Sequence, residues 1–151
     1  MMMRMLALAG FLALITLAAW GAETQPATQP ATQAATEPGM LPIRYERSGG
    51  FAGTHDVVEI GIHGEVVVDG KLMGKGKGQL TPEQMTKLAT LFADWKAAKY
   101  PAPPGSADGF EFKIRYGKAE VTASDMNEKL PEAFTAVQRA IEKIARDVTG
   151  K

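Results

Sequence analysis

The sequence predicts an α+β domain, an antiparallel sheet of about four strands with two helices packed on one face. Three observations lead to this fold class. Short runs alternate between apolar and polar residues, as strands with one buried face do. Two other segments repeat apolar residues at steps of three and four, which is typical of helices that bury one side. The runs follow one another as strands, helix, strands and helix.

The first group of strands lies before residue 70. Residues 41–47 form a short apolar run, and residues 56–62 place Val58, Ile60 and Ile62 on one face. Residues 65–68 form a further β run, and the Asp69-Gly70 pair after it predicts a tight turn. Residues 70–78 hold four glycines among lysines, so we expect a loose edge or a loop there.

The first helix is expected from Thr81 to near Ala98. Thr81, Pro82 and Gln84 form a helix start in which threonine caps, proline occupies the first turn and glutamine reaches back. The apolar residues then follow one stripe, Met85, Leu88, Phe92 and Trp95. We expect Trp95 to be buried where this helix meets the sheet.

A hairpin and a second helix complete the domain. Residues 109–123 alternate on both sides of Gly117-Lys118, which suits a two-residue turn. The second helix is expected from about Pro131 to Val148. Its apolar stripe is Leu130, Phe134, Val137, Ile141, Ile144 and Val148. Phe134 should therefore be buried against the sheet.

The amino-terminal segment predicts export. Residues 1–22 carry Arg4, an apolar run and small residues, the layout of a cleavable signal peptide. The alternative is an uncleaved segment that anchors the chain in a membrane. Residues 23–40 repeat Thr, Gln, Pro and Ala and are expected to be a disordered linker before the domain at 41–151. The chain is therefore expected to be secreted or periplasmic, with membrane contact only if the signal stays uncleaved.

The composition argues against an enzyme and against nucleic-acid binding. The chain has no cysteine, and its 17 basic residues balance 17 acidic ones. Its only histidines are His55 and His63, and His55 beside Asp56 is most simply an exposed pair. Asp108 and Glu111 flank a hairpin, where carboxylates are usually solvated. No catalytic set, metal site or cofactor motif is recognised, so we expect a non-enzyme without cofactor or metal.

Residues 44–53, Arg-Tyr-Glu-Arg-Ser-Gly-Gly-Phe-Ala-Gly, stand out. Three glycines within five residues permit positive φ and the close approach of another backbone. Phe51 lies between them. Either this is a glycine turn with Phe51 in the core, or it is an exposed binding loop.

The stretch Tyr-Glu-Arg-Ser-Gly-Gly-Phe-Ala-Gly at 45–53 resembles the opening of the emfourin family, inhibitors of protealysin and related thermolysin-like metalloproteases. Leu80-Thr81-Pro82-Glu83, the prolines at 101–104, the aromatic strand at 110–117 and Leu130-Pro131-Glu132 follow in the same order as in that family. The resemblance covers about residues 42–146. Residues 62–79 are longer than in compact members, and the signal peptide and linker are additions.

The resemblance implies an inhibitor that blocks the cleft of an exported thermolysin-like metalloprotease. Such enzymes favour a large apolar residue just after the cleaved bond, so Phe51 is the expected anchor. The candidate contacts are the loop residues Ser48, Gly49, Gly50, Phe51, Ala52 and Gly53. The alternative is a non-inhibitory exported binding module of the cell envelope with the same fold.

Overall fold

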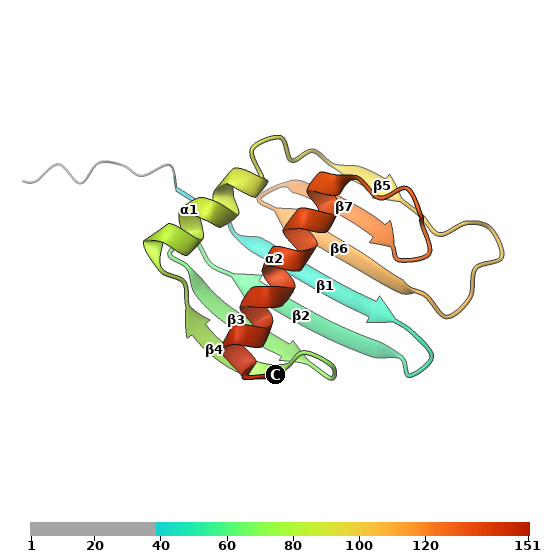
Figure 1. The fold of residues 1–151 in the computed structure, drawn as a ribbon, viewed down its shortest axis with the longest axis horizontal. Helices are drawn as coiled ribbons and strands as arrows, with labels where there is room; N and C mark the ends of the chain where they lie inside the picture. Colours follow the sequence, from blue (N-terminus) through green and yellow to red (C-terminus); the bar gives the residue numbers. More distant parts are fainter. Residues whose placement is uncertain (1–38) are drawn as a thin grey trace, which may run out of the picture. The chain divides into compact units, whose positions relative to one another are not determined.

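A computed structural model describes residues 39–151, which form one seven-stranded sheet with two helices (Figure 1). The predicted signal peptide and the predicted linker as far as residue 38 lie outside the described residues. In chain order the elements are β1 (Ile43–Gly49), β2 (Thr54–Ile60), β3 (Glu65–Gly70), β4 (Gly74–Gln79), α1 (Pro82–Leu91), β5 (Ala98–Tyr100), β6 (Phe110–Tyr116), β7 (Ala119–Ser124) and α2 (Glu132–Thr149).

The sheet is larger than expected and mixed. Its strand order is β4-β3-β2-β1-β6-β7-β5, and β5 pairs with β7 in parallel while the other neighbours are antiparallel. The expected antiparallel sheet of about four strands is therefore wrong, although the α+β class holds. The two-residue turn at Gly117-Lys118 separates β6 from β7 as expected.

Strand β4 occupies residues that we expected to be a loose edge or a loop. Its glycines face α2, where a Cβ on Gly76 or Gly78 would come within 3.0 Å or 2.6 Å of the Val148 side chain. Its lysines alternate with them and are exposed. The glycines thus let the end of α2 lie close to the sheet, a packing reason for a composition that otherwise disfavours strands.

The turn before β4 also differs from expectation. Asp69 and Gly70 belong to β3, and the turn follows them at residues 71–73. Gly70 is needed as a strand residue because a Cβ there would collide with the Asp56 carboxylate.

Helix α1 starts as expected but ends earlier. Thr81 and Gln84 form the capping box, and the helix ends at Leu91 with Phe92 as its C-cap. Trp95 follows the turn at residues 92–94, and its ring packs edge-on against Phe92 at 5.0 Å and stacks on Phe134 at 6.4 Å between centroids. Trp95 is only partly buried, and the chain then continues into β5.

Both helices cover one face of the sheet (Figure 1). Phe134, Val137 and Ile141 of the predicted α2 stripe are buried as expected, whereas Leu130, Ile144 and Val148 are partly buried and Ala145 is a further buried residue. The core consists of these residues and the apolar side chains of β1–β3, β6 and β7 that alternate toward the helices. The Tyr45 hydroxyl, on the same face, donates to Glu142 Oε1 of α2 at 2.8 Å.

The opposite face of the sheet carries charged side chains. Arg44 pairs with Glu46 on its own strand and with Glu59 on β2, and Arg115 pairs with Glu120 at 2.7 Å. These residues alternate with core residues along their strands. One face of the sheet therefore packs on helices, and the other is polar, as in many antiparallel sheets.

Candidate functional site

The hairpin tip between β1 and β2 presents Phe51 to solvent. Ser48 and Gly49 continue β1, and residues 50–53 form the turn. The Gly53 N–H donates to the Gly50 carbonyl at 3.0 Å, and both glycines have positive φ, 57° and 68°. Phe51 is 96% exposed, which excludes the alternative that its ring packs in the core.

The start of β6 supports the tip on one side. The Gly50 N–H donates to the Gly109 carbonyl at 3.0 Å. A Cβ on Gly50 would come within 2.8 Å of the Phe110 ring, and one on Gly49 would lie 2.5 Å from the Gly109 carbonyl oxygen. The glycines before Phe51 therefore allow a close backbone approach, and this contact fixes the base of the tip.

A buried ion pair supports the tip from beneath. Arg47 donates from Nε and Nη2 to Asp56 Oδ2, at 3.0 Å and 2.6 Å, and its guanidinium lies 5.5 Å from the centre of the Phe110 ring. Asp56 is fully buried, and its Oδ1 accepts from the backbone N–H groups of Leu72 and Met73 at 2.8 Å and 3.2 Å. Asp56 thus joins the hairpin to the β3–β4 turn.

The same contacts keep Asp56 ionised. Burial disfavours its charge and raises its pKa, but the hydrogen bonds from Arg47 and from the two backbone N–H groups act in the opposite direction. The net result is a pKa below the usual value for aspartate. A charged carboxylate in this position is the acceptor that four surrounding donors require.

Neither histidine is part of an ion pair in residues 39–151, although His55 shares a shallow hollow with Glu59 and Asp69. His55 is exposed on the face opposite the buried Asp56, because neighbouring strand residues point to opposite sides. His63 is exposed in the turn after β2. Within residues 39–151, no group of three or more His, Asp or Glu side chains could hold a metal ion. Neither of the two described helices, α1 and α2, has the length and hydropathy of a membrane-spanning helix.

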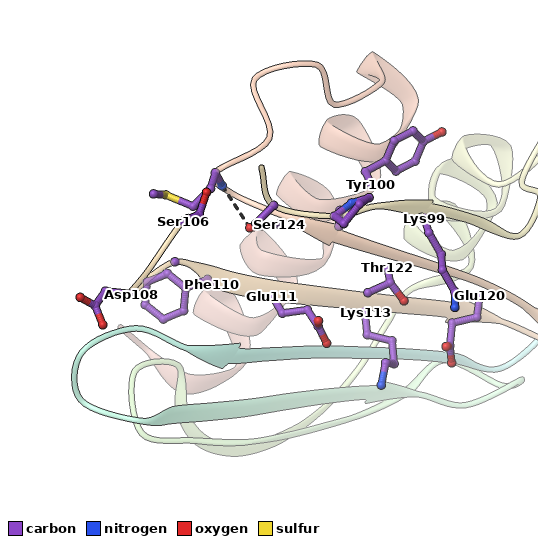
Figure 2. Close-up of a pocket in the computed structure, with 15 residues that line it drawn as sticks. Lys99, Tyr100, Ser106, Asp108, Phe110, Glu111, Lys113, Glu120, Thr122 and Ser124 are labelled. Atoms are coloured by element: carbon purple, nitrogen blue, oxygen red, sulfur yellow. Dashed lines mark hydrogen bonds between the residues drawn. The ribbon is translucent and has the colours of Figure 1, made fainter. Parts of the chain in front are cut away.

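A shallow groove of about 570 Å³ lies beside the tip, on the polar face of β6 and β7 (Figure 2). The β5–β6 loop, which contains Asp108, forms its wall. Figure 2 shows Lys99, Lys113, Glu111 and Glu120 along it, so its charges are mixed. Asp108 and Glu111 both line the groove, but they belong to a broad polar surface without a convergent set of groups.

The structure places the six candidate contact residues at the end of β1 and in the turn after it, and whether they contact a protease stays a prediction. Sequence reasoning did not find the residues that support this turn. Arg47 lies in the motif at residues 44–53, and Asp56 lies in the strand predicted at residues 56–62. Their pairing could have been inferred from strand alternation. Asp56 shares a face with Val58 and Ile60, so it is buried and needs a cationic partner. The only cation on the inner face of β1 is Arg47.

Known proteins add no assignment to this site. No protein-family model matches the chain, and no curated protein matches it significantly.

Proposed function

We propose that the chain is an exported, emfourin-like inhibitor of thermolysin-like zinc metalloproteases and acts by blocking the substrate cleft. The observation that carries this proposal is the 96% exposure of Phe51 on a hairpin whose base is fixed. A solvent-exposed phenylalanine has no role in the core of this domain. It is the kind of side chain that anchors protein interfaces.

The Phe51 side chain would occupy the pocket in which these proteases hold the apolar residue after the cleaved bond. The tip loses little conformational entropy on docking, because the Gly50 N–H and the Gly53 N–H are already hydrogen-bonded. Positive φ at Gly50 and Gly53 makes the chain turn back on either side of Phe51. A segment that turns this way is a poor substrate, because proteases bind their substrates in extended form.

The alternative is a non-inhibitory binding module of the cell envelope. The groove beside β6 and β7 favours it, since this groove is a concave surface that does not include Phe51. In that case the groove would bind an exported partner, and no catalytic cleft would be blocked.

The decisive measurement is the inhibition constant of the full chain against a panel of thermolysin-like proteases, with and without Phe51→Ala. We expect the substitution to weaken inhibition by about 2 kcal/mol or more, the magnitude of an interface hot spot. Melting temperature should not change, because the side chain makes no core contact.

Ile62→Ala is the matched control. Ile62 is 51% exposed in the turn after β2, at the opposite end of the sheet. Its substitution should leave the inhibition constant unchanged. Full inhibition by the Phe51→Ala protein would remove the tip from the mechanism, and inhibition of no protease in the panel would leave the binding-module alternative.

A further inference from the structure

Three exposed apolar side chains lie along the end of the sheet that carries the hairpin tip. They are Phe51, Leu72 in the β3–β4 turn and Met126 after β7, with exposures of 96%, 49% and 40%. We call these three residues the apolar row. Strand pairing fixes their order, because the β3–β4 turn lies on one side of the tip and the end of β7 on the other.

The register gives the spacing of the row. Strands lie about 4.8 Å apart, so the centre of the β1–β2 tip is about 10 Å from that of the β3–β4 turn and about 12 Å from β7. Gly70, the last residue of β3, pairs with Asp56, whereas Gly49, the last residue of β1, pairs with Thr54. The β1–β2 hairpin therefore extends two residues farther than β3 at this end of the sheet. The tip therefore projects roughly 7 Å beyond the β3–β4 turn.

Direct contacts connect both flanking segments to the tip. Lys71 Nζ donates to the Ala52 carbonyl at 3.5 Å, and the Leu72 N–H donates to Asp56 Oδ1. On the other side, Gly109 accepts from the Gly50 N–H, and the Asp125 N–H donates to the Phe110 carbonyl at 3.1 Å. A Cβ on Gly109 would come within 2.5 Å of the Met126 side chain, so Met126 lies against the residue that supports the tip.

The hairpin tip alone is too small to bury the surface area of a stable interface. A specific complex buries about 800 Å² on each partner, whereas one aromatic side chain supplies only about 150–250 Å². The surfaces nearest to Phe51 are the two flanking segments, and both carry half-exposed apolar side chains. A projecting apolar residue with a half-exposed apolar residue in each flanking segment fits a cleft with two rims.

We infer that Leu72 and Met126 are the second and third contacts of the inhibitor, packing on the two rims of the protease cleft while Phe51 enters it. This inference rests on the proposed function and extends it from one loop to three segments. It assigns to the partner a cleft with apolar rims about 22 Å apart, the sum of the distances from the tip to the β3–β4 turn and to β7.

The test compares Leu72→Ser, Met126→Ser and the double variant of the full chain, against the protease that the unaltered chain inhibits most strongly. Each single substitution should raise the inhibition constant about fivefold to tenfold, as expected for exposing half of an aliphatic side chain at an interface. The double variant should show roughly the product of the two effects, because the two residues lie far apart.

Two further sets of variants separate binding from folding. Leu41→Ser and Ile62→Ser alter exposed apolar residues at the other end of the sheet and should change inhibition less than about twofold. Leu72→Met and Met126→Leu keep apolar side chains of similar volume and should retain inhibition. Melting temperatures of all variants show whether any loss of inhibition follows from unfolding.

The outcomes distinguish this inference from the proposed function. If Phe51→Ala weakens inhibition but Leu72→Ser and Met126→Ser do not, the apolar row is not the interface and the inhibitor proposal stands. If Leu41→Ser and Ile62→Ser weaken inhibition as much as the row variants do, the inference is also overturned. Failure of the unaltered chain to inhibit any protease overturns both.

Discussion

Replacing Asp56 by alanine removes the carboxylate that joins the hairpin to the β3–β4 turn. This carboxylate is fully buried and accepts four hydrogen bonds, two from Arg47 and two from the backbone of Leu72 and Met73. The variant would leave the guanidinium of Arg47, whose side chain is 17% exposed, without its anionic partner. Breaking a buried ion pair from one side typically costs about 3–5 kcal/mol. That is a large part of the roughly 5–15 kcal/mol by which a domain is stable.

Urea denaturation of the full chain and of Asp56→Ala measures this cost. Asp147→Ala is the control, since Asp147 forms an ion pair of 2.7 Å with Lys143 on the surface of α2. Both of its side chains are more than half exposed, so this pair should contribute less than about 0.5 kcal/mol. A loss below about 1 kcal/mol for Asp56→Ala would refute the view that the buried pair holds this end of the sheet.

The pH dependence gives a second measurement on the same group. The folded state lowers the pKa of Asp56, so its charge contributes stability above the unfolded-state pKa of about 3.9. This contribution is lost as the pH falls through the lower pKa of the folded state. The difference in unfolding free energy between the unaltered chain and Asp56→Asn should therefore be largest near pH 7 and shrink below about pH 4. A difference that is constant from pH 7 to pH 3 would contradict the assignment.

Two further predictions concern the core and the linker. Phe134→Ala should destabilise the domain by about 3–5 kcal/mol in urea denaturation, because the ring is 2% exposed and stacks on Trp95; a midpoint near that of the unaltered chain would contradict the packing of α2. Deletion of residues 23–38 should leave the melting temperature unchanged, because their Thr-Gln-Pro-Ala repeat has no apolar pattern; a fall of several degrees would show that the linker packs on the domain. Met40 is kept in that variant because its side chain is buried in the core.

Patterns of neighbouring residues were sufficient to predict several elements of the fold. The α2 stripe, the capping box at Thr81 and the turn at Gly117-Lys118 were all predicted, because each depends on residues near one another in the sequence. The strand alternation around Val58 and Ile60 also predicted β2 and the face that it buries.

The two edge strands could not be predicted because they depend on distant partners. The sequence of β4 is typical of a loop, and its glycines are explained only by their packing against Val148. Val148 is about seventy residues later in the sequence than Gly76 and Gly78. Strand β5 has three residues and pairs in parallel with β7, and no pattern of so short a length specifies that pairing. The same applies to the site. Phe51 was recognised from its motif, but the contacts of Gly50 with Gly109 and Phe110 follow only from the β1–β6 register.

The two ends of the described chain leave the sheet at opposite ends. Met40 precedes β1 at the end farthest from the tip, and the seven residues of β1 span roughly 23 Å. Lys151 instead lies beside Gly74, next to the β3–β4 turn that carries Leu72. A carrier protein or a surface attached ahead of residue 39 therefore joins the domain on the side away from Phe51, whereas a carboxyl-terminal fusion starts beside the apolar row. For display or immobilisation, amino-terminal attachment leaves the hairpin accessible.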